Sequence, residues 1–98
     1  MPAIYTKHPI RPTIIGQKVF RARLSLGETQ PLFAKRFMVS HITVHKWETG
    51  KVLRLSHIYQ RILDSIVDKL KTDGRWMSDE TFKVFYQRNI DSRGNIYQ

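Results

Sequence analysis

The feature that most constrains this chain is the close spacing of helix start and stop residues in its first fifty positions. Thr13, Thr29 and Ser40 are suitable helix N-caps, because a short side-chain oxygen accepts hydrogen bonds from the free amides of a first turn. Gly27 and Gly50 suit helix ends, since glycine adopts the left-handed conformation there without strain. These residues predict three short helices with very short connections.

The apolar spacing predicts which side of each short helix faces the core. The first helix is expected at about 14–26, and in the second Pro31 falls in the first turn, where proline is tolerated. In the third helix, at about 41–49, Val44 and Trp47 are three residues apart and therefore point inward together. The inward residues of the first two helices are Ile15, Val19, Ala22, Leu26, Phe33, Ala34 and Phe37.

The second half of the chain predicts two more helices. A longer helix is expected over about 56–71, where the apolar residues cover more than one narrow stripe. Residues 72–74 break it, and the segment 78–80 brings acidic side chains to the positive start of a fifth helix. The expected fold is all-α, a compact bundle of about five helices. The apolar residues of these two helices are Ile58, Ile62, Leu63, Ile66, Val67, Leu70, Phe82, Phe85 and Tyr86.

Positive charge is concentrated in the N-terminal half. The chain has 17 lysines and arginines against 8 acidic residues, a net charge of +9, and the segment 1–51 contains only two of the acidic residues. Such an excess favours a polyanionic partner, such as nucleic acid or an acidic membrane surface. Prolines and cations in 1–13 predict an irregular basic arm, followed by a domain over 14–71 and a C-terminal helix and tail over 72–98.

Composition argues against several classes of protein. No run of about 18 apolar residues is present to span a bilayer, and the N-terminus lacks the apolar stretch of a signal peptide, so we expect a cytoplasmic protein with no membrane partner. The absence of cysteine excludes disulfides and thiolate nucleophiles. A glycine-rich phosphate loop and paired carboxylates in the basic half are also missing, so we expect neither an enzyme nor a cofactor.

Two other binding modes have weak support. His41 and His45 have a spacing that can hold zinc, but Ile42 occupies the position of the general base in a His-Glu-x-x-His site, so no metal is expected. Peripheral membrane binding needs a basic amphipathic helix, and here the most basic region is not the most amphipathic one.

The segment 29–51 resembles the helix-turn-helix of the phage repressor and Cro family, also called the xenobiotic-response-element family. Ala34 is the small residue needed where two helices cross, Val44 is the inward residue of the second helix, and the ending reads Trp-Glu-x-Gly-Lys over 47–51. Upstream, residues 23–27 are similar to the end of the family's first helix. The resemblance covers about residues 14–70 and implies a fold of the lambda-repressor-like type.

The resemblance implies sequence-specific binding to double-stranded DNA by a transcriptional repressor, with the helix-turn-helix at about 30–49 and helix 41–49 in the major groove. The family's principal base-reading positions match His41, Ile42 and Lys46. Lys46 suits the O6 and N7 acceptors of guanine, and Ile42 suits the methyl group of thymine. Flanking or phosphate contacts are expected from Thr29, Gln30, Ser40, Thr43, His45 and Lys51.

Two further residue assignments follow from the resemblance. The family pairs an arginine of its first helix with the glutamate of the Trp-Glu motif, which corresponds here to a structural ion pair between Arg23 and Glu48. Met38 is a departure, because the family usually has glycine in a left-handed turn at this position. A methionine in that conformation costs roughly 1 kcal/mol.

The partners of such a protein include a second copy of itself, because one recognition helix reads only a few base pairs. The apolar excess of the 56–71 helix and of the fifth helix favours a homodimer. An alternative function is the antitoxin of a toxin-antitoxin pair, which binds a toxin and regulates its own promoter. In that case the segment from Trp76 to Tyr86 serves the protein partner instead of dimerisation.

Overall fold

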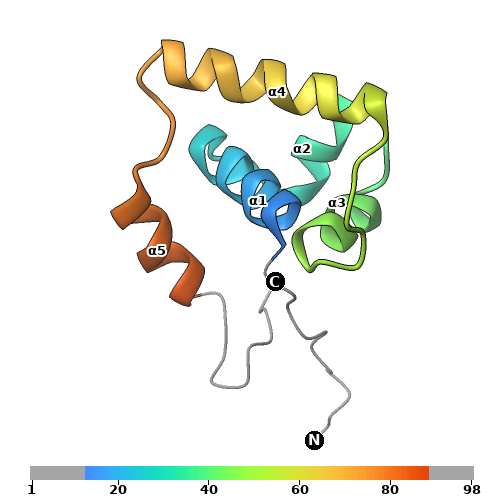
Figure 1. Ribbon diagram of the computed structural model, residues 1–98, viewed down its shortest axis with the longest axis horizontal. Coiled ribbons are helices and arrows are strands. Elements are labelled where there is room, and N and C mark those ends of the chain that lie inside the picture. The colour runs from blue at the N-terminus through green and yellow to red at the C-terminus, as the bar shows by residue number, and fades with distance from the viewer. Residues whose placement is uncertain (1–12, 89–98) are drawn as a thin grey trace, which may run out of the picture.

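Five helices and no strand make up residues 13–88, the part of the chain that this computed structural model describes (Figure 1). The expected all-α fold is confirmed. Residues 1–12 of the expected arm and the tail from residue 89 lie outside the described residues. The helices are α1 (Ile14–Leu26), α2 (Gln30–Phe37), α3 (His41–Glu48), α4 (His57–Thr72) and α5 (Asp79–Arg88).

The three short helices begin at the expected capping residues. The hydroxyl of Thr13 accepts the amide of Gly16 at 2.9 Å, and Thr29 and Ser40 each accept the amide three residues ahead at 3.4 Å. Gly27 ends α1 in the left-handed conformation, with φ of 69°. Local side-chain chemistry therefore sets the bounds of these helices.

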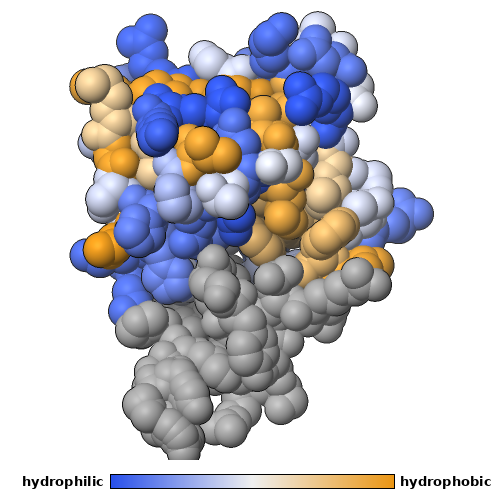
Figure 2. Space-filling model, turned by 180° about the vertical axis from the view of Figure 1, so that it is seen from behind, coloured by the Kyte–Doolittle hydropathy of each residue, from blue (hydrophilic) through white to orange (hydrophobic). Residues whose placement is uncertain are grey.

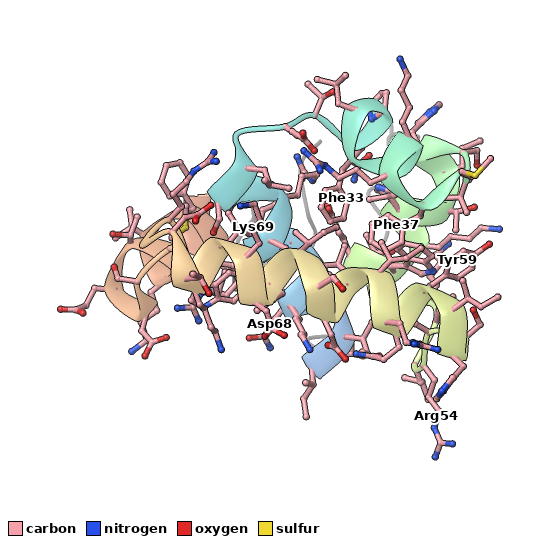
Figure 3. The ribbon with its side chains drawn as sticks, turned by 90° about the horizontal axis from the view of Figure 1, so that it is seen from above. Phe33, Phe37, Arg54, Tyr59, Asp68 and Lys69 are labelled. Atoms are coloured by element: carbon pink, nitrogen blue, oxygen red, sulfur yellow. The ribbon has the colours of Figure 1, made fainter. Side chains whose placement is uncertain are left out.

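The core lies where α4 crosses the three short helices, and Figure 1 shows α4 as one long rod along the top of the molecule. Aromatic rings fill the part of the core beneath the start of α4. The ring centroids of Phe33 and Phe37 are 5.2 Å apart, and Trp47 is 5.2 Å from Phe37 and 5.4 Å from Tyr59. Figure 3 shows Phe33, Phe37 and Tyr59 at this junction. The fully enclosed aliphatic residues around it include Val19, Ala22, Ala34, Val44 and Leu63.

The apolar surface of α4 covers more than one narrow stripe, as expected. Leu63, Val67 and Leu70 are buried, Ile62 and Ile66 are partly buried against the same core, and Ile58 is 69% exposed. Ile58 lies in the first turn of α4, where the neighbouring Tyr59 is the residue that packs on Trp47.

Helix α5 packs on the side of α1 away from α3 (Figure 1). The rings of Phe82 and Tyr86 lie 6.1 Å and 5.9 Å from that of Phe20 in α1. Phe85, expected on the same inward face, is instead partly exposed. Residues 82 and 86 are four apart and share one side of the helix, whereas Phe85 is rotated toward its edge.

Candidate nucleic-acid interface

The outer face of α3 carries all three residues expected to read bases. His41, Ile42 and Lys46 are exposed, whereas Thr43 and His45 are half-buried at the edges of the same face. Residues 42 and 46 are four apart and therefore lie above one another on the helix surface. The structure thus brings the candidate base-reading residues together on one side of a helix of eight residues.

The first turn of α3 is closed by its capping residue. Ser40 accepts the amide of Thr43, and the hydroxyls of these two residues lie 3.3 Å apart. Both expected flanking residues are therefore at the N-terminal end of the helix. Thr29 has the same role at the start of α2, where its hydroxyl accepts the amide of Leu32.

The inner face of α3 is held by a buried ion pair. Arg23 of α1 donates from Nε to Oε2 of Glu48 at 2.6 Å and from Nη2 to Oε1 at 3.0 Å. The side chain of Glu48 is 0% exposed. The expected pair between Arg23 and Glu48 is thus present, in the two-bond geometry that is the strongest for an arginine and a carboxylate.

Gln30 has a contact that the sequence analysis missed. Its Nε2 donates to Oε1 of Glu48 at 3.0 Å, so α2 joins α1 at the same carboxylate of α3. Gln30 was expected to contact phosphate, and one of its two amide hydrogens is directed inward instead. Only the family's spacing pointed to Gln30, and that spacing contains no signal for this inward bond.

Gly16 allows the start of α1 to approach the end of α3 very closely. A Cβ on Gly16 would lie 2.8 Å from the carbonyl oxygen of Trp47 and 3.0 Å from that of Glu48. Both neighbours are backbone atoms and cannot move aside cheaply. The contact, also missed from sequence, fixes the position of α3 against α1.

The turn between α2 and α3 keeps its left-handed residue although the residue is methionine. Met38 has φ of 57° and ψ of 42°, and its side chain is 92% exposed. The amide of Val39 donates to the carbonyl of Ala34 at 3.2 Å, which closes the turn. The methionine therefore adopts the left-handed conformation itself and bears its conformational cost.

Ion pairs neutralise several of the basic side chains. Arg36 donates to both oxygens of Glu28, at 2.9 Å and 2.5 Å, and this contact holds the pKa of Glu28 below its ordinary value. Lys18 lies 2.7 Å from Asp64 and likewise lowers the pKa of that carboxyl. The carboxylates balance the positive charges of Arg36 and Lys18 at neutral pH, so these cations contribute little to the electrostatic field around the protein.

The remaining cations around α2 and α3 are exposed. Lys35 and Lys46 have no carboxylate partner within residues 13–88, and Lys51 is exposed directly after α3. Arg54, which the sequence analysis did not select, points away from the body of the molecule in Figure 3. It lies in the connection before α4, where no periodicity marks it. Figure 2 shows that the half of the rear face nearer α2 and α3 is mostly hydrophilic, with single hydrophobic residues.

The described part of the chain, residues 13–88, contains no group of three or more metal-binding side chains, and no helix there is long and apolar enough to cross a membrane. Comparison with models of protein families, with curated proteins and with solved structures finds no significant match.

Proposed function

We propose that this protein is a cytoplasmic transcriptional repressor that binds double-stranded DNA in a sequence-specific manner, with a helix-turn-helix of the phage repressor and Cro type. The observation that carries the proposal is the division of α3 into two faces. Its inner face is locked to α1 and α2 through Glu48, and its outer face presents His41, Ile42 and Lys46 to solvent.

The dimensions of α3 support this function. Eight residues at a rise of 1.5 Å give a rod about 12 Å long, and a helix with its side chains is 10–12 Å wide, close to the major-groove width of about 12 Å. Base reading requires side chains to be held within fractions of an ångström. The buried ion pair and the backbone contact at Gly16 anchor the backbone of α3, which supports such positioning.

The exposed side chains supply two kinds of contact. The ammonium of Lys46 and the ring of His41 offer hydrogen bonds to base edges, and the aliphatic Ile42 offers contact with a thymine methyl. Lys51 and Lys35 supply charge for phosphates, which positions the protein without reading sequence.

A homodimer is part of the proposal, and the structure narrows the surface available for it. Phe82 packs on Phe20 within the same chain and is not available to a partner. Exposed apolar side chains include Leu53 in the connection before α4, Ile58 of α4 and Val84 of α5. A homodimer predicts an inverted DNA repeat with half-sites about one helical turn apart.

The test is selection of bound sequences from random duplex DNA, followed by affinity measurements on variants. Lys46→Ala and His41→Ala are each expected to weaken binding to the selected site by about 1–3 kcal/mol, with much less effect on random DNA. Lys51→Ala is expected to weaken all sequences alike and to reduce the salt slope by about one. Lys69→Ala on α4 is the control, because this exposed lysine lies on the opposite side of the molecule from α3 (Figures 1 and 3).

If Lys46→Ala and His41→Ala both keep the sequence preference while circular dichroism shows an intact fold, α3 is not the reading helix. Binding that is insensitive to salt would contradict the electrostatic part of the proposal. Copurification of a small toxin, with no selected DNA sequence, would favour the antitoxin alternative.

A further inference from the structure

A cleft opens between α1, α4 and α5, away from α3. Its volume is about 610 Å³, within the range of roughly 300–1,000 Å³ that is usual for small-molecule sites. Aromatic rings and cations line it, together with the carboxylate of Asp79. The lining includes Lys18, Arg21, Lys71, Trp76, Phe82 and Lys83.

Trp76 forms an aromatic wall that cations approach. The guanidinium carbon of Arg21 lies 4.8 Å from the centre of the Trp76 ring, and Nζ of Lys71 lies 5.7 Å from it. Both distances are within the range of cation–π attraction, about 6 Å. The cleft therefore combines flat apolar surface with positive charge.

Two of the four cations in the cleft are already matched by carboxylates. Arg21 pairs with Asp79 at 2.9 Å and also donates to the carbonyl of Met77, while Lys18 pairs with Asp64. Lys71 and Lys83 are exposed and have no carboxylate partner within residues 13–88. Two ammonium groups at the edge of the cleft are thus available to an anion.

We propose that this cleft binds a small aromatic anion, with its ring against Trp76 and its carboxylate, sulfonate or phosphate group at Lys71 and Lys83. The cleft suits an aromatic anion because a neutral ring would leave both ammonium groups unmatched and a simple inorganic anion would make no use of the apolar ring surface. The residues that line the cleft belong to α1, α4, α5 and the connection before α5. Helices α5 and α3 lie on different sides of α1 (Figure 1), so this site is separate from the outer face of α3. The inference is independent of the proposed DNA binding.

The test uses two fluorescent probes that differ only by charge. The anion 8-anilinonaphthalene-1-sulfonate is titrated into the full chain, in parallel with neutral N-phenyl-1-naphthylamine, which lacks the sulfonate. Saturable binding of one sulfonate probe per chain is expected, with weaker binding of the neutral compound. In a nitrogen–proton correlation spectrum the indole signal of Trp76 should shift, while that of the core residue Trp47 stays in place.

Charge-reversal variants distinguish binding in the cleft from attraction of the probe to the overall positive charge of the protein. Lys71→Glu/Lys83→Glu is expected to weaken binding of the sulfonate probe about tenfold or more, because each substitution replaces attraction of the anion by repulsion. Lys35→Glu/Arg54→Glu makes the same change in net charge outside the cleft and should alter the affinity less than about threefold, since screening weakens distant charges. Neither double variant should change the affinity for the neutral probe.

The proposal is overturned if the cleft variant folds, by circular dichroism, and binds the sulfonate probe as tightly as the original chain. Equal weakening by the two double variants would also overturn it, because the probe would then respond only to net charge. A shift of many core signals, including Trp47, would indicate binding to a loosened chain and would count against the cleft.

Discussion

Helices α3 and α5 both pack on α1, but they are held by different kinds of contact. Glu48 of α3 is fully buried and forms two bonds with Arg23 of α1, whereas the corresponding acidic residue of α5, Asp79, is 88% exposed. The end of α3 contacts the backbone of α1 at Gly16. Helix α5 contacts α1 through the rings of Phe82 and Tyr86, which pack on the ring of Phe20.

The comparison shows how one scaffold supports two kinds of surface. Buried charge and backbone contact tolerate little displacement, because an unpaired buried charge or a steric overlap is costly. The hydrophobic contribution of the ring contacts of α5 is non-directional, and a cleft lies beside them. The α3 side is therefore suited to holding side chains in a fixed register, and the α5 side is suited to accommodating a ligand.

The largest expected effect distinguishes buried from exposed ion pairs. Glu48→Ala is expected to lower the free energy of unfolding by about 3–5 kcal/mol, because Arg23 is left buried without its partner. Glu28→Ala is the matched control, since Arg36 binds Glu28 with the same two-bond geometry at the surface. Its expected cost is at most about 1 kcal/mol. Urea denaturation of both variants measures the difference, and equal values would remove the distinction between the two ion pairs.

A second test addresses the backbone contact of α3. Gly16→Ala is expected to destabilise by about 1–3 kcal/mol, because the added methyl overlaps the carbonyl oxygens at the end of α3. Substituting alanine at an interior helix position ordinarily stabilises it by up to about 1 kcal/mol. The sign of the change in melting temperature therefore decides whether the contact between Gly16 and the end of α3 is as tight as described. An increase would mean that α1 and α3 can separate without cost.

A substitution in the turn before α3 is expected to change the stability less than Gly16→Ala does, and in the opposite direction. Met38→Gly is expected to stabilise the protein by up to about 1 kcal/mol, because glycine adopts the left-handed conformation without strain and the exposed methionine side chain contributes no packing. Thermal unfolding monitored by circular dichroism measures it. A lower melting temperature would show that the greater freedom of glycine in the unfolded chain outweighs the strain.

The smallest effect is expected at α5. Asp79→Ala removes the exposed pair with Arg21 and should cost less than about 1 kcal/mol. A loss as large as that of Glu48→Ala would show that the two helices are held equally firmly, which would contradict the comparison.

The bounds of the helices could be predicted from sequence, because they depend on groups three or four residues apart. Thr13, Thr29 and Ser40 each bond an amide within their own first turn, so their effect is local. The burial of α4 and α5 could not be predicted as well. Ile58 and Phe85 have the right spacing for an inward face, yet where a helix meets its neighbours depends on the packing of the whole bundle.

The candidate interface could be predicted in part, through a resemblance in spacing. The family's pattern pointed to Arg23 and Glu48, and the structure brings them together. It contained no signal for the bond from Gln30, because that bond depends on how α2 and α3 cross. The sequence also contains no signal for the close contact at Gly16, since a glycine inside a helix indicates only lower helix propensity.

The meeting of three helices at Glu48 has an evolutionary consequence. The bonds that hold α3 come from its inner face, and the outer residues His41, Ile42 and Lys46 take no part in them. Substitutions at these three positions can therefore accumulate with little effect on folding. A lineage that carries this fold can therefore vary the exposed surface of α3 while its framework is inherited unaltered.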